Sequence, residues 1–168
     1  KYSTHKGPLP STKHIGYLLR IPPDWDYLRR LRDLWKGDFV IKGILTPEDA
    51  VQCQKDGADA VWISNHAARQ FEAAPAAIDC VAPIRAAVGP DYPLIYDSGV
   101  ENALDILRAI ALGADFVMLG KAFHYGVGAL GEKGAEQVVH ILKEDLQANM
   151  VQMCIARPAE AHERLYHG

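Results

Sequence analysis

Short apolar runs alternate with longer segments of helical periodicity along most of the chain. The apolar runs predict strands, which are FVIK at 39–42, DAVWIS at 59–64, PLIYD at 93–97 and DFVMLG at 115–120. The periodic segments predict helices, which lie at 24–35, 46–57, 74–89, 101–114 and 132–153. Strands this short and this uniformly apolar are typical of a parallel sheet whose two faces are both covered.

Local start and stop signals support this alternation. In the segment 46–57, Thr46 is suited to be an N-cap, Pro47 stands at the first helical position and Gly57 can end the helix. Residues 1–24 hold four prolines and little periodicity, so we expect a loop or extended lead-in there.

Polar residues that can carry chemistry gather where the predicted strands end. They are Lys42 after the first strand, Ser64 and His66 after the second, Asp97, Ser98 and Gly99 after the third, and Gly120 with Lys121 after the fourth. In (β/α)8 barrels, the loops at this end of the strands build the active site, often with a phosphate near the last two strands. The pattern therefore predicts an α/β fold, the (β/α)8 TIM barrel, of which this chain supplies the last four β/α units.

A whole barrel of this kind usually takes about 250 residues, and this chain has 168. We therefore expect residues 1–168 to be the C-terminal half of a single barrel domain. The missing N-terminal half would lie upstream or on another chain. The absence of an initiator methionine fits a chain that begins inside a longer one.

Each of these polar residues also has an ordinary structural explanation. A lysine that closes an apolar strand is commonly a solvated rim residue, and a single histidine there is commonly a hydrogen-bonded structural residue. His66 and Arg69, however, combine a base that titrates near neutral pH with a planar cation suited to a carboxylate. Because four consecutive strand ends carry such groups, we prefer the functional interpretation.

Composition and charge argue against several classes of protein. The formal net charge is −3 and the basic residues are scattered, so no footprint for nucleic acid is present. Cys53, Cys80 and Cys154 form an odd, widely spaced set, which indicates neither a disulfide framework nor a zinc site and fits a reducing compartment. No apolar run reaches the roughly 18 residues of a membrane span, and the start lacks the order of a signal peptide. We expect a cytoplasmic protein without a metal site.

Four stretches together resemble a known family. IKGILTPEDA, ISNHAARQF, YDSGV and ALGADFVMLGKAF, in this order, are similar to the C-terminal half of the FMN-dependent α-hydroxy acid dehydrogenases and oxidases. That family includes L-lactate dehydrogenase, glycolate oxidase and mandelate dehydrogenase. The resemblance runs over about residues 7–165, and the His-x-x-Arg block is its most specific part. It implies a (β/α)8 barrel, FMN as cofactor, and oxidation of an L-2-hydroxy acid, foremost L-lactate, to the 2-keto acid.

The resemblance also assigns roles to individual residues. Lys42 would lie against flavin N1 and the C2 oxygen, where its charge favours the reduced flavin, and Ser64 would hydrogen-bond the ring. The phosphate and ribityl chain would be held by Asp97, Ser98, Gly99, Val100, Glu101, Gly120 and Lys121. His66 would be the catalytic base, and Arg69 would bind the substrate carboxylate.

This chain departs from the family pattern at four positions. Ala67 follows the histidine where glycine is usual, and Ser98 replaces the second residue of the common Asp-Gly-Gly turn. Glu101 stands where many relatives have arginine, and Lys121 replaces a more common arginine, with loss of the bidentate fork. The family's active-site tyrosines, and the aspartate that orients the histidine, belong to the first half.

Partners follow from the same resemblance. They are a small 2-hydroxy acid, the missing half of the barrel, further copies in a homo-oligomer (a tetramer), and the inner membrane as a peripheral contact if a quinone accepts the electrons. Quinone, cytochrome and oxygen all stay open as acceptors, as does a glycolate-type oxidase. Two other classes also stay open, a flavin-free phosphate-binding barrel isomerase or lyase and a non-catalytic half-barrel. A flavin absorption spectrum separates the first of these from the family.

Overall fold

The computed structural model describes residues 23–69 and 71–165, and the chain forms two compact units, residues 1–36 and 37–168. In the first unit the described element is the helix α2 (Trp25–Leu34), which confirms the predicted helix. Asp24 caps it, because its side chain accepts the backbone N–H of Tyr27 at 2.7 Å. The predicted lead-in at 1–24 lies outside the described residues except for its last two.

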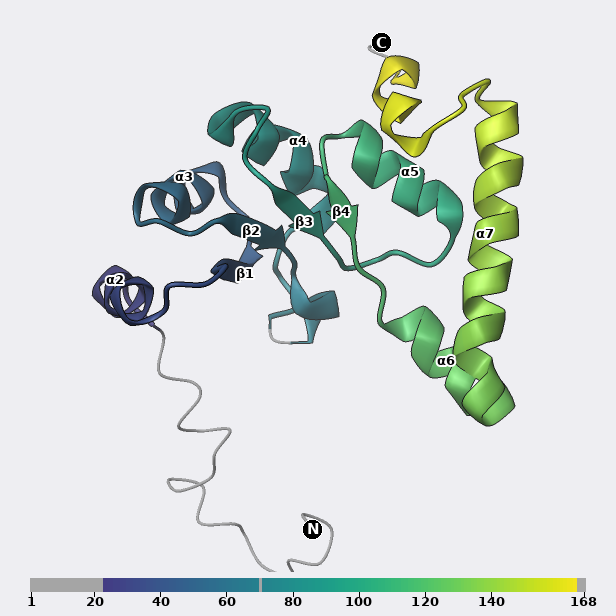
Figure 1. Ribbon diagram of the computed structural model, residues 1–168, viewed down its shortest axis with the longest axis horizontal. Coiled ribbons are helices and arrows are strands. Elements are labelled where there is room, and N and C mark those ends of the chain that lie inside the picture. The colour runs from purple at the N-terminus through teal and green to yellow at the C-terminus, as the bar shows by residue number, and fades with distance from the viewer. Residues whose placement is uncertain (1–22, 70, 166–168) are drawn as a thin grey trace, which may run out of the picture. The chain divides into compact units, whose positions relative to one another are not determined.

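The second unit is built around a parallel four-stranded sheet (Figure 1). Its strands are β1 (Val40–Ile44), β2 (Ala60–Ile63), β3 (Leu94–Tyr96) and β4 (Phe116–Val117), hydrogen-bonded in chain order. The connections carry α3 (Pro47–Lys55), α4 (Ala77–Val88) and α5 (Ala103–Ala111). Each strand is added beside the preceding one, as in a barrel wall, whereas the strand order reverses in a doubly wound sheet. The predicted parallel sheet is confirmed.

The core lies between the sheet and the helices α3, α4 and α5. Val61, Ile63 and Leu94 are fully buried there, and α4 adds Val81 and Ile84. Removing such apolar area from water at about 25 cal/mol per Å² is the main favourable term in folding. The predicted caps also hold, since the Thr46 hydroxyl accepts the N–H of Asp49 at 3.2 Å and Pro47 begins α3.

Arg85 ties together the ends of the strands that lie opposite the strand-end residues singled out above. Its guanidinium donates to the carbonyls of Gly89, Tyr92 and Gly113 at 2.8–2.9 Å and pairs with Asp115 at 2.5 Å. Gly113 has φ +113°, and a Cβ there would lie 2.7 Å from Arg85 Cγ, so both the backbone and the arginine require glycine.

The other face of the sheet carries a row of four side chains. Lys42 pairs with Trp62, Trp62 with Ile95, and Ile95 with Phe116. Parallel partners in register point to the same side of a sheet, so these residues share a face, and Phe116 is 60% exposed on it. Barrel interiors are filled by such layers of side chains.

The region after β3 differs from the prediction. The strand expected at 115–120 shrinks to the two residues of β4, and the chain turns into α6 (Lys121–Leu130), a helix that the sequence pattern did not predict. A short turn, η4 (Gly131–Lys133), then leads into α7 (Gly134–Gln152). Gly126 lets α6 and α7 approach closely, because a Cβ there would lie 2.7 Å from the carbonyl oxygen of Gly134.

The last described helical segment, η5 (Pro158–Arg164), packs with α7 on α5, where Leu107, Ile155 and Ala161 are buried together. In Figure 1, α7 begins beside α6 and then runs alongside α5. Within residues 23–69 and 71–165, no helix combines the length and the apolar character needed to cross a membrane.

Candidate functional site

A cavity of about 360 Å³ opens at the C-terminal ends of the strands. Ten of the eleven residues predicted from the sequence line it: Lys42, His66, Arg69, Asp97, Ser98, Gly99, Val100, Glu101, Gly120 and Lys121. The eleventh, Ser64, is 1% exposed and is hydrogen-bonded to residues of the lining. The fold thus gathers every predicted site residue at one place.

Lys42 is held in place by three neighbours. Its Nζ donates to the Ser64 hydroxyl at 2.9 Å and to Asp97 Oδ2 at 2.5 Å, and it lies 4.1 Å from the centre of the Trp62 ring. An ammonium has three N–H groups, of which two are used by these hydrogen bonds. The cation is therefore oriented by the protein itself.

Asp97 keeps its charge beside that lysine. Burial is the largest single influence and opposes ionisation, but hydrogen bonds from Lys42, Ser64 and Ser98 together outweigh it and lower the pKa of Asp97. Asp97 is therefore a carboxylate at neutral pH. The cation and the carboxylate form one pair at the ends of β1 and β3.

The loop that carries His66 has an uncommon backbone. Three consecutive residues of η3 (His66–Ala68) have φ values of +55°, +55° and +59°. Residues other than glycine rarely adopt this left-handed region, because Cβ approaches the carbonyl oxygen. Ala67 therefore stands in a conformation that favours glycine, which explains physically why glycine would be usual there.

The His66 ring lies beside Gly43. A Cβ built on Gly43 would be 3.1 Å from His66 Nε2, and the φ of Gly43 is +97°. The glycine after Lys42 thus makes room for the imidazole, a role that the sequence analysis missed. Arg69 lies on the exposed side of the same loop, where its Nε contacts the His66 carbonyl at 3.4 Å.

The other end of the cavity offers backbone groups and one lysine. A Cβ on Gly99 or Gly120 would meet no atom within 4 Å, so the chain at both glycines faces open space. Lys121 begins α6, and helix N-termini present N–H groups that suit a phosphate. Glu101 lines this end as well, and its carboxylate opposes an anion. A flavin phosphate fits the donors here, with one opposing charge.

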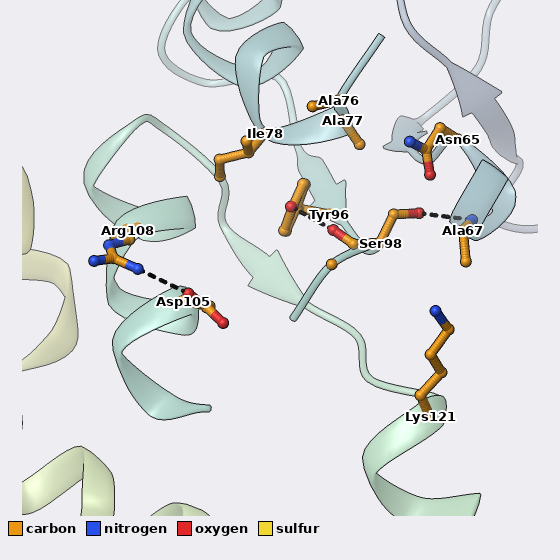
Figure 2. A pocket seen from close by; sticks show the side chains of 11 residues that line it. Asn65, Ala67, Ala76, Ala77, Ile78, Tyr96, Ser98, Asp105, Arg108 and Lys121 are labelled. Atoms are coloured by element: carbon orange, nitrogen blue, oxygen red, sulfur yellow. Dashed lines mark hydrogen bonds and ion pairs between the residues drawn. The ribbon is translucent and has the colours of Figure 1, made fainter. Parts of the chain in front are cut away.

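A second cavity of about 390 Å³ adjoins the first and shares Ala67, Ser98, Gly99 and Lys121 with it. Figure 2 shows Lys121 pointing toward the Ser98 turn from α6, with the Asp105–Arg108 pair at one side. The wall includes Tyr96, whose hydroxyl donates to the Ser98 carbonyl at 2.6 Å.

Tyr96 was not singled out from the sequence, because it ends an apolar strand and is expected there as a core residue. Burial, followed by the charges of Asp105 and Asp97, raises the pKa of Tyr96 to about 12. Its hydroxyl therefore stays protonated near neutral pH and acts as a donor that fixes the turn after β3.

Comparisons with known proteins extend the sequence resemblance. The family described as FMN-dependent dehydrogenase matches residues 2–167. L-lactate dehydrogenase of Haemophilus influenzae (strain PittEE) is 44% identical over 126 residues, which is 75% of this chain and 33% of that protein. L-lactate dehydrogenase of Pseudomonas paraeruginosa is 39% identical over 153 residues, 89% of this chain and 40% of that protein. The chain spans well under half the length of these relatives.

Solved structures give the same result. A monotopic membrane protein, (S)-mandelate dehydrogenase, matches with a TM-score of 0.78 and 39% identity, over 82% of this chain and 36% of that one. A soluble mutant of the membrane-associated (S)-mandelate dehydrogenase from Pseudomonas putida matches with a TM-score of 0.80 and 35% identity, over 93% and 46%. The four β/α units are therefore part of a (β/α)8 barrel, and the chain belongs to the family of FMN-dependent dehydrogenases.

Proposed function

We propose that this chain is the flavin-binding and catalytic half of an FMN-dependent L-2-hydroxy acid dehydrogenase, with L-lactate as its substrate. The observation that carries the proposal is the convergence of Lys42, His66 and Arg69 on one cavity. The relatives named L-lactate dehydrogenase support the choice of substrate.

His66 and Arg69 divide the work on the substrate. The guanidinium of Arg69 binds the carboxylate through two parallel hydrogen bonds, which also orients the neighbouring hydroxyl-bearing carbon. His66 removes a proton from the substrate, because an unprotonated imidazole nitrogen carries a lone pair that accepts a proton. Both side chains come from one short loop, so the distance between base and clamp is set locally.

FMN, when bound, supplies the acceptor for the two electrons that leave the substrate. Lys42 would hold the pyrimidine side of the ring with its remaining N–H, and the buried Ser64 would act through Lys42, because its hydroxyl accepts a hydrogen bond from that ammonium. Gly99, Gly120 and Lys121 would hold the phosphate. The oriented Lys42 cation favours negative charge on the group in front of it, which makes electron acceptance easier.

The open face of the sheet supports a half-barrel. Phe116 and the half-buried Trp62 lie in the row that faces away from the helices, and β1 and β4 are edge strands within residues 37–165. Exposed apolar rows and open edges favour association, and barrel closure removes both. We propose that four further β/α units, on the same polypeptide or another, cover this face. This chain together with those units is called the completed barrel below.

Two partners extend the proposal. We propose a homo-oligomer and a peripheral contact with the inner membrane. The membrane contact is supported by the description of the mandelate dehydrogenases as monotopic or membrane-associated. If a quinone accepts the electrons, a peripheral contact would bring the enzyme close to the membrane in which the quinone is dissolved.

The test is flavin content followed by anaerobic mixing. The completed barrel should be purified yellow, and its flavin absorbance should bleach with L-lactate and stay unchanged with D-lactate as the matched control. L-mandelate and glycolate complete the panel. A protein that takes up no flavin would refute the proposal. Faster bleaching by L-mandelate than by L-lactate would make L-mandelate the proposed substrate in place of L-lactate.

A further inference from the structure

Two serine hydroxyls hold two consecutive backbone amides of the His66 loop. The N–H of His66 donates to Ser64 Oγ at 3.1 Å, and the N–H of Ala67 donates to Ser98 Oγ at 3.4 Å. The two hydroxyls lie 3.4 Å apart, one at the end of β2 and the other in the turn after β3. The loop is thus fixed to two strands at adjacent peptide groups. Figure 2 shows the Ser98 side chain directed at the Ala67 amide.

The donors and acceptors of this cluster complement each other. Ser98 Oγ donates to Asp97 Oδ1 at 2.8 Å, which leaves its lone pairs for the Ala67 amide and the Ser64 hydroxyl. Ser64 Oγ accepts from Lys42 and His66, so its own proton can go to Ser98 or Asp97. When the Ser64 proton goes to Ser98, each hydroxyl uses its donor and both acceptor positions. Ser98 is the member that connects the carboxylate of the Lys42–Asp97 pair to the histidine loop.

The backbone at Ser98 does not explain why a serine is there. Its φ is +86°, a region that glycine enters freely and other residues rarely adopt. A residue kept there against that preference implies a contribution from its side chain, and the hydroxyl makes three contacts.

We propose that Ser98 is a positioning residue for the base: its hydroxyl holds Ala67 in the left-handed conformation and thereby sets where His66 and Arg69 stand relative to Lys42. The proposal rests on the proposed function, in which His66 is the base. The hydrogen bonds run from Asp97 through Ser98 to Ala67. They join the Lys42–Asp97 pair to the loop that carries His66, and the two form one rigid unit.

The test compares Ser98→Gly with Ser98→Ala in the completed barrel. Both variants lack the hydroxyl, but glycine relieves the positive φ while alanine keeps a Cβ there. The Tm of the glycine variant should therefore exceed that of the alanine variant. In both, anaerobic reduction by L-lactate, expressed per bound flavin, should slow by about threefold to tenfold, the range expected for one neutral hydrogen bond. FMN affinity should stay within about twofold, because the backbone of the turn is kept.

Thr46→Ala is the matched control. It also removes a hydroxyl that accepts a backbone amide, at the N-cap of α3, and Thr46 lines neither cavity. It should lower the Tm and leave the reduction rate per bound flavin unchanged. If a structural role is all that Ser98 has, its variants behave like this control, and the proposal is then overturned. It is also overturned if only the alanine variant is slow, since backbone strain would then be the cause.

Amide hydrogen exchange gives a readout that does not depend on turnover. Loss of the hydroxyl should reduce protection at the Ala67 amide more than at the Asp49 amide, whose acceptor is Thr46 Oγ. Thr46→Ala should give the opposite order. Failure of the parent protein to take up flavin or to be reduced by any hydroxy acid would refute the proposed function. Unchanged protection at Ala67 in both Ser98 variants would refute the positioning role.

Discussion

The two ends of the main cavity are built in different ways. At the end formed by β1, β2 and the Asp97 turn, Lys42, Ser64 and Asp97 are joined by side-chain hydrogen bonds of 2.5–2.9 Å, and Ser64 is buried. At the end formed by β4 and α6, the lining includes Met118, Leu119, Gly120, exposed Lys121 and His124, and exposed Glu101 adds to it from the turn after β3. The first end is assembled before a ligand arrives, and the second offers donors that a ligand would order.

This difference separates chemistry from affinity. Preorganised groups stabilise charge that develops during a reaction without rearrangement, whereas flexible cations and backbone N–H groups mainly hold a phosphate. Substitutions at the first end should therefore change rates and keep FMN bound. Substitutions at the second end should change FMN affinity and keep rates.

His66→Gln should give the largest effect. Glutamine has no group that accepts a proton near neutral pH, so flavin reduction by L-lactate in the completed barrel should slow by roughly 10²- to 10⁴-fold. FMN should stay bound, because the proposed flavin contacts come from other residues. Anaerobic stopped-flow at the flavin band measures both. A flavin-replete variant with a near-normal rate would end the assignment of His66 as base.

Arg69→Lys should weaken substrate binding. An ammonium cannot form the two parallel hydrogen bonds of a guanidinium. The variant should therefore lose about 2 kcal/mol of transition-state stabilisation, which lowers kcat/KM. The loss should appear mainly in KM for L-lactate, with FMN affinity unchanged. If L-lactate kinetics barely change, the carboxylate binds elsewhere in the cavity.

Gly43→Ala should displace the base. The added Cβ would lie 3.1 Å from His66 Nε2, so the imidazole must move, and the reduction rate should fall about tenfold, as expected for modest overpacking. Gly89→Ala is the matched control, since Gly89 has φ +87° and a Cβ there meets nothing within 4 Å. Both variants should lose stability through backbone strain, but only the first should be slow. Equal rates would remove Gly43 from the site.

Glu101→Arg should increase the affinity of the phosphate end of the cavity for FMN. The change removes a carboxylate from the phosphate end and adds a cation, which should lower the FMN Kd by roughly fivefold, the order of an exposed ion pair. The reduction rate per bound flavin should stay unchanged. Glu136→Arg, the same change on exposed α7, is the control for net charge. Equal tightening in both variants would show a general charge effect instead of a local one.

The Asp97 carboxylate should show itself in the pH dependence of stability. Hydrogen bonds hold the pKa of Asp97 below its unfolded value of about 3.9, so its ionised form adds stability at higher pH. That contribution is lost as the pH falls from about 4 through the lower folded pKa. In urea titrations across this range, lowering the pH should therefore decrease the unfolding free energy of the Asp97→Asn variant less than that of the parent. Equal slopes would mean that Asp97 is not held as a carboxylate.

Much of this architecture was readable from the sequence, because short apolar strands and polar strand ends follow from local pattern and barrel topology. Two features were not. The helix α6 was missed because Gly126 and Gly128 weaken its propensity and because Met118 and Leu119 continue the apolar run of β4.

The hydrogen-bonded cluster was also out of reach of the sequence. Its formation depends on the parallel register, which pairs Lys42 with Trp62 and places the ends of β1, β2 and β3 side by side. Gly43 and Trp62 were missed for a related reason, since a glycine and an aromatic residue within an apolar strand are ordinary in a barrel wall. The identities of the site residues are local information, and their contacts are not.

The position of Trp62 has an optical consequence. It is the sole tryptophan in the sequence from residue 37 to residue 168, and its indole ring lies 4.1 Å from the Lys42 ammonium. A flavin held by that ammonium would lie within energy-transfer range of the indole, so its arrival should quench tryptophan emission. With Trp25 and Trp35 replaced by phenylalanine, Trp62 would be the one tryptophan left in residues 1–168. The barrel wall therefore contains a spectroscopic reporter of cofactor loading, positioned by the same lysine that is proposed to hold the flavin.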